Sequence, residues 1–267
     1  MHVSHPPLWT HDVVLHGAGG LLAALILAWL LLAEPLLGLR SFRDFLRALQ
    51  GGDTHARTRF YRRWIVQSWG LMVLLLGLSI YGFGWTPAQL GLRMPQLRQS
   101  WPWAFLGGLV LSLCCGALIG AMLARRHRKS SVDAVSKPAR HSAAEVLNML
   151  PRTPAERGWF TVLAVTAGIT EEVIWRGLLL ALLVATIPGL PMYAQALALS
   201  VAFGWAHLYQ GVRGMLGTAI LGGVLTALYL TTGSLLLPVI VHVLIDLAAM
   251  LQTPRPKRTP THDHPVA

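Results

Sequence analysis

The chain has 267 residues, of which 54% are hydrophobic and only 12% are charged. A soluble domain carries about 25% charged residues, so this composition excludes an ordinary soluble enzyme and indicates a membrane protein. The formal net charge of +11 is concentrated in the connections between apolar segments. That distribution is typical of membrane topology, and it argues against a nucleic-acid partner.

Apolar segments recur along the whole chain, and seven of them have the length needed to cross a membrane. A hydrocarbon core of roughly 30 Å needs about 20 helical residues. The alternating pattern of a membrane barrel is absent, so we expect an all-α, polytopic transmembrane helix bundle of about seven spans. In chain order the predicted spans cover approximately 13–33, 64–84, 103–123, 159–187, 192–209, 214–231 and 233–251.

The basic residues of the connections predict how the spans are oriented. The connection 38–63 contains seven arginines, and the connection 124–158 contains eight lysines and arginines. Such basic connections alternate with connections that are poor in positive charge. By the positive-inside rule the N-terminus is outside and the C-terminus is cytoplasmic. We therefore expect an integral multi-pass protein of the plasma (bacterial inner) membrane, with the lipid bilayer as its first partner.

The predicted spans divide the chain into three regions. Residues 1–158 form an N-terminal membrane region with three spans and basic cytoplasmic loops, including a short amphipathic piece after residue 38 and a short surface helix at 141–150. Residues 159–251 form a core of four spans. The tail 252–267 is basic and rich in proline, so we expect it to be disordered.

Several ionisable side chains lie inside the four C-terminal spans. A charge at the bilayer centre costs roughly 2.5–3.5 kcal/mol, so such residues persist where they pair, face the bundle interior or take part in chemistry. We interpret this set as a candidate functional site on three helices. Its members are Glu171, Glu172, Arg176, His207, His242 and Asp246.

Helical spacing separates the roles of these residues. Glu172 and Arg176 are four positions apart with the acid first, which favours an ion pair on one helix face and can be purely structural. Glu171 is rotated by about 100° and can face a different partner. Phe203 and His207 are one turn apart, although a lone histidine in a membrane helix can also be simple hydrogen-bonded packing.

The last span places His242 and Asp246 four residues apart on one face. Such a pair can be a satisfied contact, half of a metal site or half of a catalytic cluster. With the topology above, this pair, Glu171 and His207 all fall in the cytoplasmic half of the membrane. They can therefore converge on one water-accessible cavity, where carboxylates and imidazoles suit the activation of water.

Three short sequences together resemble a known family. "EEVIWR", "FGWAH" and "HVLID" match, in order, the EExxxR, FxxxH and HxxxN/D motifs. Residues 159–251 thus resemble the CPBP family of CAAX proteases and bacteriocin-processing proteins, also called Abi-type intramembrane proteases. The resemblance implies an endopeptidase in which Glu171 is the general base and His207 helps it to hold the attacking water.

The resemblance also implies roles for the remaining motif residues. His242 and Asp246 resemble the pair that binds the oxyanion, while Glu172 and Arg176, with Phe203, organise the site. Type II prenyl proteases have asparagine in place of Asp246, and an aspartate donates a hydrogen bond only when it is protonated. Asp246 therefore either is protonated, orients His242, or helps to hold a metal.

Members of the family have been described as metalloproteases and as glutamic proteases. We expect metal-free chemistry and no cofactor, because the chain contains no H-E-x-x-H sequence. The alternative is a divalent metal such as zinc, held by Glu171, His207 and His242.

The predicted function is hydrolysis of a peptide bond in a membrane-associated or lipid-modified protein or peptide. The substrate could be a lipid-modified C-terminus, a bacteriocin-like leader or a membrane-anchoring sorting tail. Two other interpretations stay open: a non-catalytic membrane immunity or scaffold protein of the same fold, and a proton-coupled membrane carrier. The sequence lacks the paired broken helices that mark inverted repeats, which argues against the carrier interpretation.

Overall fold

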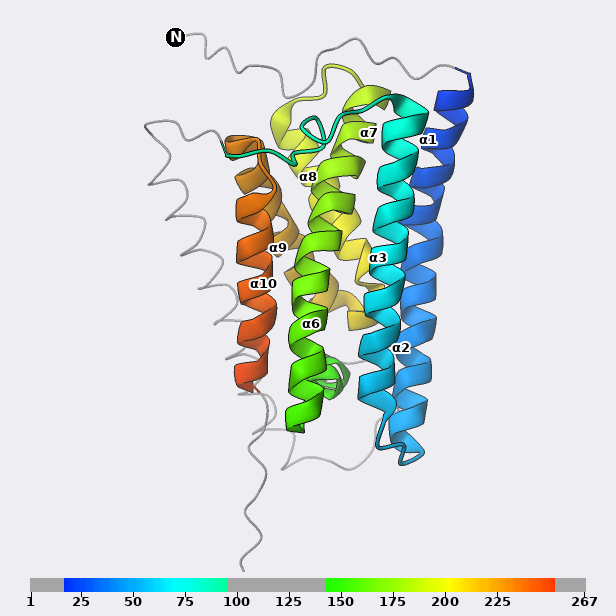
Figure 1. Ribbon diagram of the computed structural model, residues 1–267, viewed down its shortest axis with the longest axis vertical. Coiled ribbons are helices and arrows are strands. Elements are labelled where there is room, and N and C mark those ends of the chain that lie inside the picture. The colour runs from blue at the N-terminus through cyan, green and yellow to red at the C-terminus, as the bar shows by residue number, and fades with distance from the viewer. Residues whose placement is uncertain (1–16, 96–142, 253–267) are drawn as a thin grey trace, which may run out of the picture.

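The computed structural model describes residues 17–95 and 143–252. These residues form a bundle of long helices that run along one common axis, and they contain no strand (Figure 1). The predicted all-α architecture is therefore confirmed for the described part of the chain. The third predicted span, 103–123, and residues 253–267 of the predicted tail lie outside it.

The N-terminal helix is longer than the sequence predicted. It comprises α1 (Ala18–Ala28), a π-helical stretch (Trp29–Ala33) and α2 (Glu34–Gln50) without a break. The sequence predicted a span that ends at residue 33, followed by a separate amphipathic piece. The helix continues because that piece buries its apolar face in the bundle, with the ring of Phe45 stacked 4.5 Å from that of Phe60.

The second and fourth predicted spans are also present as helices. The second corresponds to α3 (Ala56–Phe83), and the fourth runs through α6 (Pro154–Glu171), a π-helical stretch (Glu172–Leu179) and α7 (Leu180–Thr186). α6 begins at Pro154, five residues before the predicted start of the fourth span, and side-chain caps fix this start. The Thr153 side chain accepts from the Glu156 N–H, and the Glu156 carboxylate accepts from the Thr153 N–H, which is a capping box.

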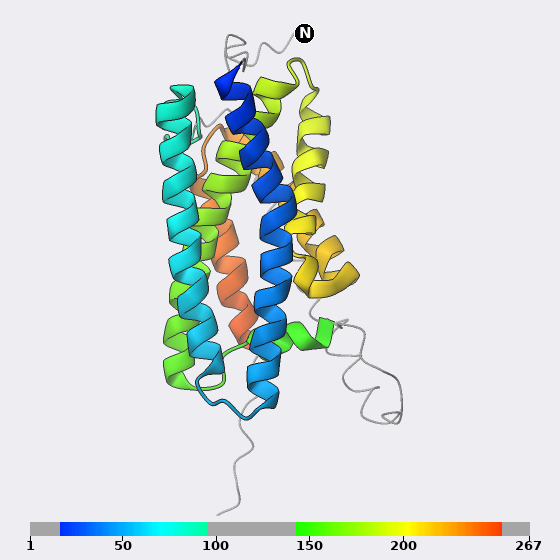
Figure 2. The same ribbon diagram turned by 90° about the vertical axis from the view of Figure 1, so that its right-hand side faces the viewer.

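The short surface helix that we predicted at 141–150 is observed as α5 (Ala143–Val146) and a 3₁₀ turn (Leu147–Met149). The C-terminal helices follow the predicted order, and α8 and α9 lie side by side (Figure 2). Their bounds are α8 (Met192–Ala206), a 3₁₀ turn (Leu208–Gln210), α9 (Gly211–Thr232), α10 (Leu236–Ala249) and a final 3₁₀ turn (Met250–Gln252).

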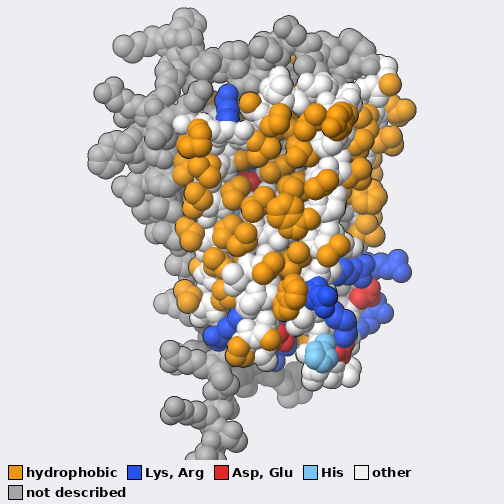
Figure 3. Space-filling view, viewed as in Figure 1, with side chains coloured by type: hydrophobic (Ala, Val, Ile, Leu, Met, Phe, Trp, Pro, Cys, Tyr) orange, Lys and Arg blue, Asp and Glu red, His pale blue; other side chains and the backbone are white. Residues whose placement is uncertain are grey.

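Three of the described helices are long and apolar enough to cross a membrane, namely Ala18–Gln50, Ala56–Phe83 and Leu208–Thr232. α8 and α10 are apolar but shorter. Hydrophobic side chains are spread over the upper and middle part of the described surface, whereas lysine and arginine gather mainly at its lower end (Figure 3). These features indicate an integral membrane protein, although fewer helices meet the length and composition of a span than the seven we expected for the whole chain.

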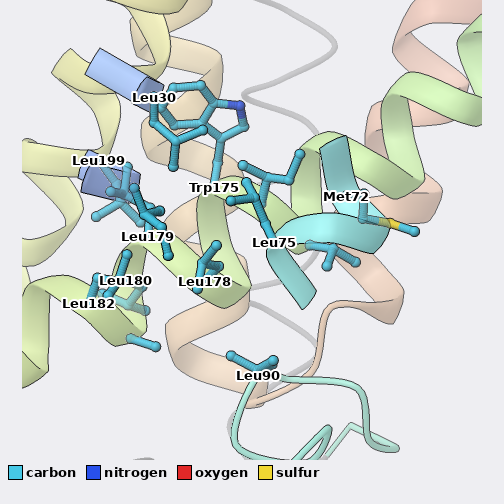
Figure 4. Close-up of a cluster of buried hydrophobic side chains, with 14 of the residues drawn as sticks. Leu30, Met72, Leu75, Leu90, Trp175, Leu178, Leu179, Leu180, Leu182 and Leu199 are labelled. Carbon is cyan, nitrogen blue, oxygen red and sulfur yellow. The ribbon is translucent and has the colours of Figure 1, made fainter. Parts of the chain in front are cut away.

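Two hydrophobic clusters fill the interior of the bundle. The upper cluster includes Leu30, Trp175 and Leu199, and its leucines come from several helices (Figure 4). The lower cluster includes Phe42 and Tyr209. The buried polar residues Glu172 and Arg176 are interleaved with Val173, Ile174 and Trp175 of the upper cluster, and they belong to the candidate site.

Candidate functional site

The structure brings together all six ionisable residues that the sequence singled out. Each has a nitrogen or oxygen atom within 4.0 Å of an oppositely charged or histidine partner in the set. We call this group the polar layer; it consists of Glu171, Glu172, Arg176, His207, His242 and Asp246. The polar layer comes from three parts of the chain. Glu171 is the last residue of α6, and Glu172 and Arg176 lie in the π-helical stretch that follows. His207 directly follows α8, and His242 and Asp246 lie on α10.

A glycine allows α6 and α10 to approach closely just below the polar layer. A Cβ atom on Gly168 would lie 2.4 Å from Cγ2 of Val243, so only glycine fits this position without displacing the neighbour. Val243 directly follows His242. The close approach therefore carries the His242 ring toward the two glutamates of α6 and its continuation.

The predicted ion pair between Glu172 and Arg176 is present and fully buried. Nη1 of Arg176 donates to Oε1 of Glu172 at 2.8 Å, and Nη2 donates to the carbonyl oxygen of Gly222 at 3.2 Å. The guanidinium also lies over the Phe203 ring, 4.1 Å from its centroid. Phe203 thus supports the site by covering a buried cation.

A contact that the sequence did not predict joins His242 to this ion pair. Nδ1 of His242 lies 2.7 Å from Oε1 of Glu172. A carboxylate only accepts hydrogen bonds, so Nδ1 carries the hydrogen and donates it. The opposite ring nitrogen, Nε2, is thereby directed toward Glu171 at 4.0 Å and Asp246 at 3.8 Å.

His207 is oriented by the end of α8. The sequence predicted a helix that continues to residue 209, but α8 ends at Ala206 and His207 leaves the helical conformation. Its Nδ1 donates to the carbonyl oxygen of Phe203 at 2.8 Å, and a carbonyl of the last helical turn is satisfied in this way. Nε2 of the neutral ring is then an acceptor, and it lies 3.9 Å from Oε2 of Glu171.

The carboxylate of Glu171 lies between the two imidazoles. Its Oε2 atom is buried and has no hydrogen-bond partner within the described part of the chain. Separations of 3.9 and 4.0 Å to the two Nε2 atoms exceed a hydrogen bond, but one water molecule can bridge them. The side chains of Glu171 and Asp246 remain 21% and 33% exposed, so this side of the polar layer borders the surface although Oε2 of Glu171 is itself covered.

Glu171, His207 and His242 are also the residues that the sequence analysis gave as alternative ligands for a metal. Ligands of a tetrahedral zinc ion lie about 2.1 Å from the metal and hence about 3.4 Å from one another. The separations of 3.9 and 4.0 Å are wider. Among the described residues, no group of three or more histidine, cysteine, aspartate or glutamate side chains is arranged to hold a metal.

The N-terminal helix is tied to the site by a contact that sequence reasoning missed. Leu31 lies in the π-helical stretch that precedes Pro35, a residue without an N–H, so the regular helical hydrogen bonds are interrupted near its carbonyl oxygen. The indole Nε1 of Trp205 supplies the donor instead, at 2.7 Å. Trp205 lies two positions before His207, so this bond anchors the end of α8 to the first helix.

Replacing Trp205 by phenylalanine should destabilise the protein by about 1–3 kcal/mol, because the Leu31 carbonyl loses its donor where lipid cannot replace it. Thermal unfolding in lipid nanodiscs measures the effect. Trp29→Phe, at an exposed position of the first helix, is the matched control and should change stability much less. Equal stability of both variants would show that the bond contributes nothing.

Comparison with known proteins supports the motif assignment. Residues 153–248 match the sequence model of a family described as type II CAAX prenyl endopeptidase, Rce1-like. The matched segment contains the whole polar layer and excludes α1, α2 and α3. No curated protein and no solved structure matches the chain.

Proposed function

We propose that the protein is an intramembrane endopeptidase, since its residues 153–248 belong to the CPBP/CAAX protease family and carry a water-binding arrangement. One observation supports hydrolysis most directly. The buried Oε2 of Glu171, which no hydrogen bond from the described residues satisfies, lies between two imidazole nitrogens at one-water distance. A general base of a hydrolase needs this kind of geometry.

In this mechanism, a water molecule donates one hydrogen bond to Glu171 and one to Nε2 of His207. Glu171 takes a proton as the water oxygen attacks the carbonyl carbon of the scissile peptide bond. The developing oxyanion accepts a hydrogen bond from Nε2 of protonated His242, whose other nitrogen stays bound to Glu172. When the carbon–nitrogen bond breaks, Glu171 returns its proton to the leaving amine.

Asp246 has the role of a positioning residue in this proposal. Its Oδ2 lies 3.8 Å from Nε2 of His242, a separation that suits electrostatic support of the protonated ring. Of the three roles left open by the sequence, orientation of His242 is therefore favoured. A protonated Asp246 that donates directly to the oxyanion is the second candidate, because its side chain is 33% exposed, against 6% for His242, and can reach a bound substrate.

The substrate in this proposal is a membrane-associated or lipid-modified protein or peptide. The family description names prenyl endopeptidases, which favours a lipid-modified C-terminus. Arginines gather at the end of the bundle where α2 meets α3, and the positive-inside rule assigns that end to the cytoplasm of a plasma (bacterial inner) membrane. We propose that substrates reach the polar layer from this side, through the bilayer.

Cleavage by the purified protein tests the proposal. The protein in nanodiscs is incubated with S-farnesylated C-terminal peptides and with the same peptides lacking the lipid, and the products are identified by mass. We expect cleavage of the lipidated peptides near the modified cysteine. A folded protein that cleaves neither set would contradict the proposal and favour the scaffold or carrier alternatives.

Metal-free chemistry makes a separate prediction. Treatment with EDTA and 1,10-phenanthroline should leave the cleavage rate unchanged within about twofold, because the proton transfers use only carboxylates and imidazoles. The measurement compares the initial rate of untreated protein with that of protein treated with the chelators and then freed of them. A loss of activity that added Zn²⁺ restores would instead assign Glu171, His207 and His242 to a metal.

A further inference from the structure

A carboxyl group outside the family match also faces the polar layer. Glu34 is the first residue of α2, on the helix that connects Leu30 of the upper cluster to Phe42 of the lower cluster. Its Oε2 atom is buried and lacks a hydrogen-bond partner among residues 17–95 and 143–252. A carboxyl group held in this way inside a membrane protein is costly, which points to a function.

The contacts of its helix show where Glu34 points. Leu31, Glu34 and Gly38 share one helix face, because their spacings are three and four residues. The carbonyl of Leu31 accepts from Trp205, and a Cβ atom on Gly38 would lie 4.0 Å from Cδ1 of Tyr209. These two contacts lie on either side of His207 in the sequence, so Glu34 is directed at the polar layer.

Glu34 thus adds a second buried carboxyl group to the interior that holds Glu171. The polar layer consequently has an excess of acceptors. Oε2 of Glu34, of Glu171 and of Glu172 lacks a hydrogen-bond partner among the described residues, whereas Nε of Arg176 is a buried donor without an acceptor there. A single water molecule has two hydrogens, which serve Glu171 and His207, so Glu34 still requires a donor.

The balance of charge indicates what kind of donor fits. The layer and Glu34 together contain four carboxyl groups, whereas Arg176 is the one permanently charged cation among them and already contacts Glu172. A cationic group therefore supplies what the site lacks, because it brings both positive charge and several hydrogen-bond donors. A neutral amide N–H would satisfy the hydrogen bond but leave the charge uncompensated.

We propose that Glu34 is a specificity-determining residue, which binds a positively charged side chain of the substrate close to the scissile bond. This inference rests on the proposed peptidase function and extends it to substrate selection. It also assigns the N-terminal helix, which the family match does not cover, a direct part in recognising the substrate.

Peptide binding tests this inference independently of catalysis. The probes are S-farnesylated decapeptides that carry lysine, norleucine or glutamate at one position at a time. Their dissociation constants are measured with the wild-type protein in nanodiscs, with Glu34→Gln, and with Glu145→Gln, which makes the same chemical change on α5. Cleavage rates of the same peptides are recorded in parallel.

We expect the wild-type protein to prefer lysine over norleucine at one position. Glu34→Gln should weaken binding of that lysine peptide about 10- to 100-fold, as for loss of a charged hydrogen bond, and leave the norleucine peptide unchanged. Glu34→Lys should reverse the preference toward glutamate, and this variant provides a second test if Glu34→Gln folds poorly. Glu145→Gln should behave as wild type.

Two results would overturn the inference: a wild-type protein without a lysine preference at any position, or a Glu34→Gln variant in which the lysine and norleucine peptides weaken equally. Failure of the peptidase function is a different result. In that case no peptide is cleaved by the wild-type protein, whereas the Glu34-dependent lysine preference in binding is retained.

Discussion

A Glu171→Gln variant will fold and insert like the wild-type protein but will lose about 10²- to 10⁴-fold in kcat, the contribution of a general base. Oε2 of Glu171 accepts no hydrogen bond from the described residues, so the amide replaces it without breaking a contact. An amide cannot take a proton from water, however. The KM should change little, because Glu171 acts on the water molecule rather than on the substrate.

Initial-rate kinetics on a lipidated peptide measure this effect, with thermal unfolding as the check on folding. Glu145→Gln is the matched control and should retain wild-type kcat. If Glu171→Gln hydrolyses the peptide at the wild-type rate, Glu171 is not the general base, and its position between the two imidazoles does not contribute to catalysis.

A Glu172→Leu variant will be destabilised by about 3–5 kcal/mol, as expected when one partner of a buried ion pair is removed. Oε1 of Glu172 accepts from Nη1 of Arg176 and from Nδ1 of His242, and both donors lose their acceptor. The Arg176 charge is then buried without compensation. Activity should also fall, since the His242 ring loses the contact that directs Nε2 toward Glu171.

A double variant separates the stability effect from the catalytic effect. Glu172→Leu combined with Arg176→Leu removes both charges, so the double variant should be more stable than Glu172→Leu alone. It should not recover activity, because the His242 ring still lacks its acceptor. Unfolding in nanodiscs measures the first expectation, and peptide cleavage measures the second. If the destabilisation of the double variant equals the sum of those of Glu172→Leu and Arg176→Leu, the two residues do not act as one buried pair.

The candidate site was largely predictable because its residues contrast with their surroundings. Charged and imidazole side chains are rare in apolar helices, so Glu171, His207 and His242 stand out even before their helices are arranged in space. Periodicity correctly paired Glu172 with Arg176, since both positions belong to one helix. The three motifs then predicted the family that matches residues 153–248.

The contacts that the sequence did not predict depend on packing between distant helices. The bond between His242 and Glu172 joins residues 70 positions apart, and that between Trp205 and Leu31 joins residues 174 positions apart. Helical spacing contains no information about either. Glu34 was overlooked for a simpler reason: the first span was predicted to end at residue 33, so this carboxyl group fell just outside the predicted spans.

The local helix geometry was also beyond the sequence pattern. The π-helical stretches Trp29–Ala33 and Glu172–Leu179 each border a buried carboxyl group, Glu34 after the first and Glu171 before the second. Hydrophobic periodicity cannot distinguish a wider turn from an α-helical one over so few residues. π-Helical turns occur often at functional sites, which agrees with their position here.

The central claim is that Glu171 makes the polar layer a hydrolytic centre for membrane substrates. The most direct test compares the protein termini in membranes of cells that produce either the wild-type protein or Glu171→Gln at equal levels. We predict a set of new termini in membrane-associated proteins that is present with the wild-type protein and absent with Glu171→Gln. Identical sets of termini in the two membranes would contradict the claim.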